Sequence, residues 1–132
     1  MKTRTAVRYL IDTTVLIDHA KARPGIDGLI TRLFAEPNDL LVCDVVVAEA
    51  LSGGDERQNA TMRSLIRALE FVATHPDAAI QAGDARRRLG RTSPRGLGDA
   101  LIAGVAWFND ATVVTRNPRD FEIQGVRVLS YD

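Results

Sequence analysis

Four acidic residues and one asparagine lie next to or within apolar segments of this 132-residue chain: Asp12, Glu49, Asp99, Asn117 and Asp120. Glu49 is the least expected of these, because the apolar segment 45–48 precedes it and Ala50 and Leu51 follow it. An ionised carboxylate in apolar surroundings needs a hydrogen-bonding partner or a cation. If the acids converge, their mutual repulsion forces one to take up a proton unless a divalent cation is bound. Ligation by oxygen alone favours Mg²⁺ or Mn²⁺ over zinc.

These acids also have structural interpretations. Asp12 and Asp99 each precede a predicted helix, so either could act as its N-cap. Glu49 could instead form an ion pair with an arginine. The two histidines, His19 and His75, are predicted to be structural or solvated, so we expect no histidine ligand or base.

Phosphate chemistry is the reaction class that this combination predicts. Carboxylate-bound magnesium without a nucleophilic side chain typically activates a water for phosphodiester hydrolysis. Arg116 and Arg119 flank Asn117, and the arginine-rich segment 86–95 precedes Asp99, so cations are available for the phosphates of a nucleic acid. A solvated helix face is the alternative interpretation of the arginine run. With 17 Lys+Arg and 17 Asp+Glu, the net charge itself predicts no anionic partner.

The elements that must position these residues alternate between strands and helices. Apolar and β-branched runs predict strands, and amphipathic spacing predicts helices. The expected strands are 7–11, 40–43, 112–115 and 126–129, and the expected helices are 13–20, 26–34, 45–51 with Asp44 as N-cap, 55–70, 78–89 and 100–108 headed by Asp99, with a loop at 90–98. Such alternation predicts an α/β fold with a parallel sheet covered on both faces. Polar ligands of such sheets bind at the carboxyl ends of the strands.

Length and composition predict a single domain, residues 1–132, with a substantial core. Cys43 is the only cysteine, so an intrachain disulfide is impossible and a reducing compartment is expected. The basic N-terminus lacks the apolar core of a signal peptide, and no run approaches the ~20 apolar residues of a membrane span. We therefore expect a soluble cytoplasmic protein.

Four motifs in order resemble those of the PIN-domain nucleases, and within them the toxins of VapBC-type toxin–antitoxin pairs. They are Leu10–Ile17, Val47–Ala50, Gly98–Ala103 and Val114–Phe121. The resemblance covers nearly the whole chain. It implies a three-layer α/β/α sandwich around a parallel sheet and an Mg²⁺- or Mn²⁺-dependent endoribonuclease that inhibits translation when free of its antitoxin.

By position, the resemblance implies that Asp12, Glu49 and Asp99 are the metal-binding and catalytic acids. Either Asn117 or Asp120 would complete the set. The residues predicted to contact the substrate are Thr13, Thr14, Thr115, Arg116 and Arg95. One departure is Thr14, which places a hydroxyl where many relatives have an amide, although a hydroxyl can also hydrogen-bond a carboxylate or phosphate.

The resemblance also implies a homodimer and an antitoxin partner. The apolar stripe of the helix 26–34, with Leu33 and Phe34 at its end, is a candidate groove for an antitoxin helix. The alternative is that this stripe simply covers the sheet.

Other protein classes fit the sequence less well. A haloacid-dehalogenase-like phosphatase needs a second aspartate where Thr14 stands. A receiver domain needs a late lysine, but the only lysines are Lys2 and Lys21. A PIN-like module that binds RNA or protein without cutting it is the main alternative, because a fold can persist as an interaction module without its catalytic activity.

Overall fold

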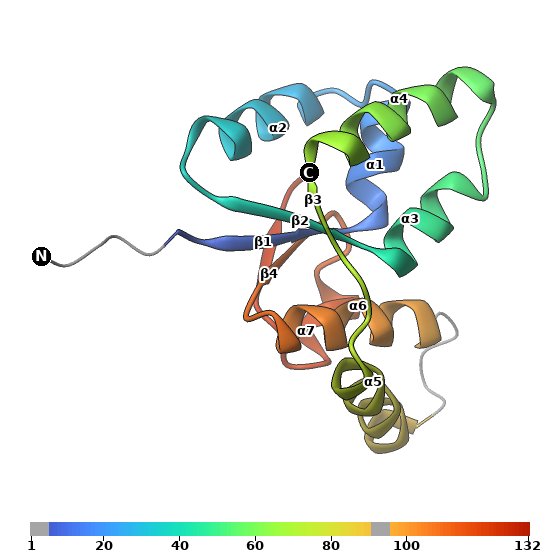
Figure 1. Ribbon diagram of the computed structural model, residues 1–132, viewed down its shortest axis with the longest axis vertical. Coiled ribbons are helices and arrows are strands. Elements are labelled where there is room, and N and C mark those ends of the chain that lie inside the picture. The colour runs from blue at the N-terminus through green and yellow to red at the C-terminus, as the bar shows by residue number, and fades with distance from the viewer. Residues whose placement is uncertain (1–5, 91–95) are drawn as a thin grey trace, which may run out of the picture.

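The computed structural model describes residues 6–90 and 96–132, which form a parallel sheet with helices on both faces (Figure 1). The sheet has the strand order β3-β2-β1-β4-β5. Its strands are β1 (Arg8–Ile11), β2 (Asp39–Cys43), β3 (Glu70–Val72), β4 (Thr112–Thr115) and β5 (Val128–Ser130). All four strand pairings are parallel, which confirms the predicted sheet.

The helices form two layers. Those on one side are α1 (Thr13–Ala20), α2 (Ile26–Ala35), α3 (Asp44–Leu51) and α4 (Glu56–Ala68), and those on the other are α5 (Pro76–Leu89), α6 (Gly96–Phe108) and α7 (Arg119–Glu122) (Figure 1). α1 contacts α2, α3 and α4, whereas α5 packs chiefly on α6. The three-layer α/β/α sandwich is therefore confirmed.

The centre of the sheet explains why polar residues gather after β1 and β4. From β1 the chain runs outward to β2 and β3 on one side, and it later fills β4 and β5 on the other. The crossover helices therefore diverge between β1 and β4, which is where parallel sheets open a crevice for ligands. The register places Ile11 opposite Val114, and the Asp12 N–H donates to the Val114 carbonyl at 3.0 Å.

The apolar strands and α6 make the core. Leu10, Leu41, Val42, Val113 and Val114 are completely buried, as expected for parallel strands covered on both faces. Gly104 lets α6 approach α5 closely, because a Cβ at this position would overlap with the Ala78 carbonyl oxygen. Among the described residues, no helix is both long and apolar enough to span a membrane.

Two helix starts differ from the sequence predictions. α6 begins at Gly96, so Asp99 lies in its first turn and not at its cap, and the predicted loop was too long. Asp44 is the first residue of α3 and not its N-cap. Its Oδ1 instead accepts hydrogen bonds from the Thr74 N–H at 3.2 Å and the Thr74 hydroxyl at 2.7 Å. For Asp44, the contact with Thr74 therefore replaces the predicted cap.

Candidate active site

The carboxylate of Asp12 is buried at the end of β1. Asp12 occupies the N-cap position of α1 but makes no side-chain capping bond. Its Oδ2 instead accepts hydrogen bonds from the Thr14 hydroxyl at 3.1 Å and the Thr115 hydroxyl at 2.8 Å. Burial raises the pKa of Asp12, and the bond from Thr115 counteracts this only in part. The site thus holds a carboxylate whose charge the surroundings disfavour.

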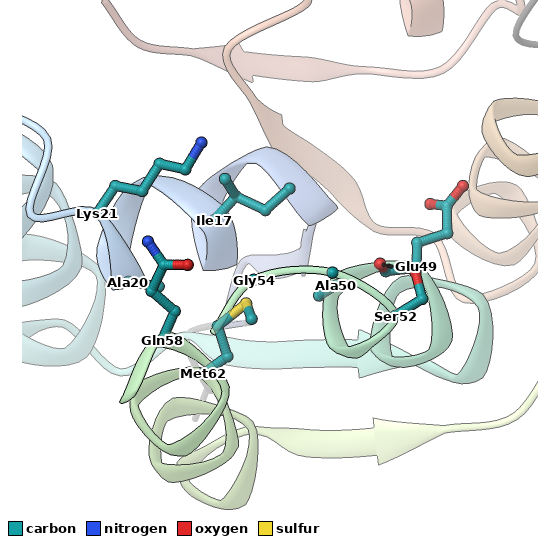
Figure 2. A pocket seen from close by; sticks show the side chains of 10 residues that line it. Ile17, Ala20, Lys21, Glu49, Ala50, Ser52, Gly54, Gln58 and Met62 are labelled. Carbon is teal, nitrogen blue, oxygen red and sulfur yellow. Dashed lines mark hydrogen bonds between the residues drawn. The ribbon is translucent and has the colours of Figure 1, made fainter. Parts of the chain in front are cut away.

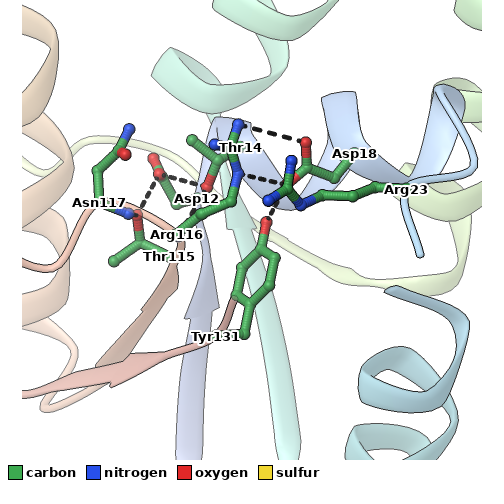
Figure 3. Close-up of polar contacts among 8 residues, drawn as sticks. All are labelled: Asp12, Thr14, Asp18, Arg23, Thr115, Arg116, Asn117 and Tyr131. Carbon is green, nitrogen blue, oxygen red and sulfur yellow. Dashed lines mark hydrogen bonds and ion pairs between the residues drawn. The ribbon is translucent and has the colours of Figure 1, made fainter. Parts of the chain in front are cut away.

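The segment after β4 is fastened to Asp12 through the same hydroxyls (Figure 3). The Arg116 N–H donates to the Thr14 Oγ1 at 3.2 Å, and the Asn117 N–H donates to the Thr115 Oγ1 at 3.0 Å. Each hydroxyl therefore accepts a hydrogen bond from a backbone N–H and donates one to the Asp12 carboxylate. These contacts bring Asn117 next to Asp12.

Glu49 lies on α3, and its side chain is exposed, contrary to the apolar surroundings expected from its neighbours. The neighbouring valines face the core, while the helix turns Glu49 outward. Its Oε1 accepts a hydrogen bond from the Thr13 hydroxyl at 2.9 Å. Its Oε2 lies so close to Gly98 that a Cβ at that position would overlap with it.

Asp99 is half-buried in the first turn of α6, one residue beyond Gly98. The Glu49 carboxylate therefore contacts both Thr13, which follows Asp12, and Gly98, which precedes Asp99. Within residues 6–90 and 96–132, however, no three His, Cys, Asp or Glu side chains are grouped as a metal cluster. The convergence of the acids on one ion thus stays a prediction. The donor types still fit a hard divalent cation, because carboxylate oxygens are its preferred ligands and a cation would offset the disfavoured charge of Asp12.

Asp120 lies in the same turn as Asn117, because its N–H donates to the Asn117 carbonyl at 3.3 Å. It projects from α7 and lines a hollow together with Arg86 and Gly96, beside the start of α6.

The guanidinium of Arg116 is bound by Asp18, a residue that the sequence analysis did not single out. The Arg116 Nε donates to the Asp18 Oδ2 at 2.9 Å and the Nη2 to the Oδ1 at 3.4 Å. The Tyr131 hydroxyl also donates to the Asp18 Oδ2, at 2.7 Å. An acid inside the otherwise apolar helix α1 was the signal that could have found Asp18. Arg95, the other predicted phosphate-binding arginine, lies outside the described residues.

The profile of the PIN domain matches residues 9–125. The chain belongs to the PIN domain family. The matched region runs from β1 to the segment after α7, and it therefore includes every candidate metal ligand named above.

Curated relatives of this PIN domain carry nuclease names. Ribonuclease VapC19 of Mycobacterium tuberculosis is 32% identical over 114 residues, which cover 85% of this chain and 90% of the relative. The tRNA(fMet)-specific endonuclease VapC of Salmonella typhimurium is 30% identical over 129 residues, which cover 92% of this chain and 96% of the relative.

Solved structures similar to this PIN domain include chains of toxin–antitoxin complexes. A chain of DNA-bound VapBC from Salmonella typhimurium matches with a TM-score of 0.79 and 28% identity, over 94% of this chain and 98% of that chain. A chain of VapBC2 from Rickettsia felis, bound to a promoter DNA fragment, also reaches a TM-score of 0.79, over 96% and 100% of the two chains. Its identity is 22%, so this second match shows the fold alone.

A hollow of about 180 Å³ lies beside Glu49 in the PIN domain, between α1, α3 and α4 (Figure 2). Apolar side chains from α1 and α4 line it, among them Ile17, Ala20 and Met62. Figure 2 shows Glu49 at one end of this hollow, apart from the apolar group.

The two residues of α2 that were predicted to contact a partner differ in exposure. Leu33 is only 6% exposed and packs into the core, which leaves Phe34, 46% exposed, as the candidate contact of that pair. Ile26, Leu29 and Leu33 of this stripe are buried in the core, and its use as a groove for an antitoxin helix stays a prediction.

Proposed function

We propose that this PIN domain is a metal-dependent endoribonuclease that acts as the toxin of a toxin–antitoxin pair and inhibits translation when free. The observation that carries this proposal is the buried Asp12 carboxylate at the end of β1, with Glu49 bound to the next residue, Thr13, and lying against Gly98, the neighbour of Asp99. The names of the curated relatives, a ribonuclease and a tRNA endonuclease, support the same reaction class. An RNA substrate and a single buried cysteine favour action in the cytoplasm.

Asp12, Glu49 and Asp99, with Asn117 or Asp120, are the residues that would hold Mg²⁺ or Mn²⁺. When bound, the ion supplies an activated water and neutralises charge on the phosphate. Thr14 and Thr115 would keep Asp12 oriented, because their hydroxyl protons already bind its Oδ2.

The side chains predicted to bind RNA take two kinds of role. Thr13, Thr14 and Thr115 donate to carboxylates, so they position the acids more directly than they contact phosphate. Arg86, Arg87 and Arg88 are exposed in the last turn of α5, where Arg86 lies against Gly96 and Arg87 and Arg88 could approach an RNA backbone. Arg116 and Arg95 remain proposed substrate contacts, although the Arg116 guanidinium is also held by Asp18 and Arg95 lies outside the described residues.

We propose an antitoxin partner for the hollow between α1 and α4. A short apolar segment of the antitoxin would cover Ile17 and Met62, and its end would reach Glu49. The similar chains from VapBC complexes support this choice of partner. Phe34 and a homodimeric state are further parts of the proposal.

RNA-end sequencing after expression of the parent and of Asp99→Asn tests the nuclease. We expect new 5′ ends at defined sites with the parent and about 100-fold fewer with Asp99→Asn. Asp84→Asn is the matched control, because Asp84 is exposed on α5 away from the candidate ligands. Identical RNA ends for the parent and Asp99→Asn would contradict the proposal.

A non-catalytic PIN-like module that binds RNA or protein is the second candidate function. It is favoured by the exposed arginines in the last turn of α5, which could bind RNA without a metal. Purified protein that binds RNA in Mn²⁺ without producing fragments would establish this alternative.

A further inference from the structure

We propose that Asp18, Arg116 and Tyr131 form a positioning network that fixes the Thr14 hydroxyl on Asp12. The proposal rests on the function proposed above, since it assigns the network to the same site. Within residues 6–90 and 96–132, these three side chains hydrogen-bond one another and Thr14 but no predicted metal ligand, so each acts through another residue.

The network joins three segments that are distant in sequence (Figure 3). Asp18 comes from α1, Arg116 follows β4, and Tyr131 follows β5. The Asp18 side chain is 5% exposed, and its Oδ2 accepts from both the Arg116 Nε and the Tyr131 hydroxyl. Arg23 adds a more distant cation, with its Nε 4.0 Å from the same oxygen. Asp18 is thus the common acceptor that holds the other two.

The route from this cluster to Asp12 runs through the backbone of Arg116. The Arg116 side chain is held by Asp18, and the Arg116 N–H donates to the Thr14 Oγ1. A hydroxyl carries a single proton, so an oxygen that accepts from Arg116 directs that proton to its other neighbour. The acceptor of that proton is the Asp12 Oδ2, 3.1 Å away, and the Tyr131 hydroxyl contacts the same Thr14 side chain. Fixing the Arg116 side chain therefore fixes which way the Thr14 proton points.

A role in stability alone explains this cluster poorly. The Arg116 side chain is 36% exposed and that of Asp18 is 5% exposed, so water screens the pair while the buried carboxylate loses hydration, and the net stabilisation is small. The bidentate Arg116–Asp18 contact instead supplies fixed geometry. Burial raises the pKa of Tyr131, and acceptance of its proton by Asp18 raises it further, so the hydroxyl stays a donor at neutral pH.

Tyr131→Phe is the most discriminating variant, because it keeps the ring and removes only the hydroxyl, which contacts Asp18 and Thr14. We expect it to leave the KM for RNA near the parent value and to lower kcat about 10-fold. We expect the affinity for Mn²⁺, measured by calorimetry without RNA, to fall about 10-fold as well. Exchange of the Arg116 amide proton, followed by NMR, should become faster. Asp18→Asn should show the same pattern with larger changes.

Asp110→Asn is the matched control. It alters a surface ion pair, in which the Arg127 Nη2 lies 2.8 Å from the Asp110 Oδ1, and both side chains are exposed. We expect this variant to match the parent in kcat, Mn²⁺ affinity and Arg116 exchange.

Parent-like Mn²⁺ affinity and Arg116 exchange in Tyr131→Phe would overturn the network, even if the melting temperature fell. If Asp18→Asn does not fold, Tyr131→Phe decides alone. A parent protein that cuts no RNA would defeat the proposed function. The exchange of the Arg116 amide would still test the network, so the two failures are distinguishable.

Discussion

The Glu49 carboxylate of α3 lies against the backbone of Gly98 in the first turn of α6. Its other oxygen accepts a hydrogen bond from Thr13, so one side chain joins the end of β1 to the start of α6. Gly98 does not adopt a left-handed backbone conformation. A side chain at position 98 would therefore take the space that Glu49 occupies, and it would not strain the backbone.

Gly98→Ala should separate stability from activity. The added Cβ would displace the Glu49 Oε2, and the exposed glutamate can swing away at little cost, while alanine improves the helix by up to about 1 kcal/mol. We expect unchanged or slightly higher stability in urea unfolding, with about 10-fold lower Mn²⁺-dependent RNA cleavage. Gly28→Ala on α2 is the control, because no atom lies within 4 Å of its added Cβ. Equal activities of the two variants would show that the position of Glu49 is unimportant.

Asp12→Asn should stabilise the metal-free protein. Burial raises the pKa of Asp12, which means that its ionised form is disfavoured in the folded state, and a neutral amide removes that charge. We expect a higher melting temperature in EDTA and the loss of any further rise on adding Mn²⁺. Scanning fluorimetry at neutral pH measures both, with Asp84→Asn as control. An Mn²⁺-induced shift as large as that of the parent would argue against Asp12 as a ligand.

Much of the fold could be predicted because parallel strands buried on both faces are apolar throughout. The runs ending at Ile11, Cys43 and Thr115 showed this pattern and were found. β3 was missed because Glu70 and Phe71 are exposed, so this edge strand lacks the apolar signature. The four-residue helix α7 was missed because it is too short for a periodic pattern, and the last strand was placed two residues early.

The site was less predictable than the sheet. The ends of strands pointed correctly to Asp12 and to the segment that carries Asn117. The burial of Glu49 was predicted wrongly, because the face that a helix turns to solvent depends on tertiary packing. Asp18 and Tyr131 are 113 residues apart, and no spacing rule reveals a contact over that separation.

Cys43 should be unreactive in the folded protein and should make stability depend on pH. It is fully buried at the end of β2, and burial raises its pKa from 9.0 to about 11. The unfolded thiol loses its proton first, so stability should fall as pH rises from 9.0 to about 11. Cys43→Ala should lack this part of the pH dependence in urea unfolding. Rapid reaction of the native thiol with a disulfide reagent at about pH 8 would contradict the burial.

Gly104→Ala should destabilise the contact between α5 and α6. A Cβ at Gly104 would overlap with the Ala78 carbonyl oxygen, which is backbone and cannot move aside as a side chain can. The gain in helix propensity, about 1 kcal/mol, is therefore outweighed, and we expect a net loss of about 1–3 kcal/mol in the free energy of unfolding. Gly83→Ala on α5 is the matched control, because its added Cβ meets open space. That variant should gain up to about 1 kcal/mol. Equal stabilities of the two alanine variants would mean that α5 and α6 are not packed this closely.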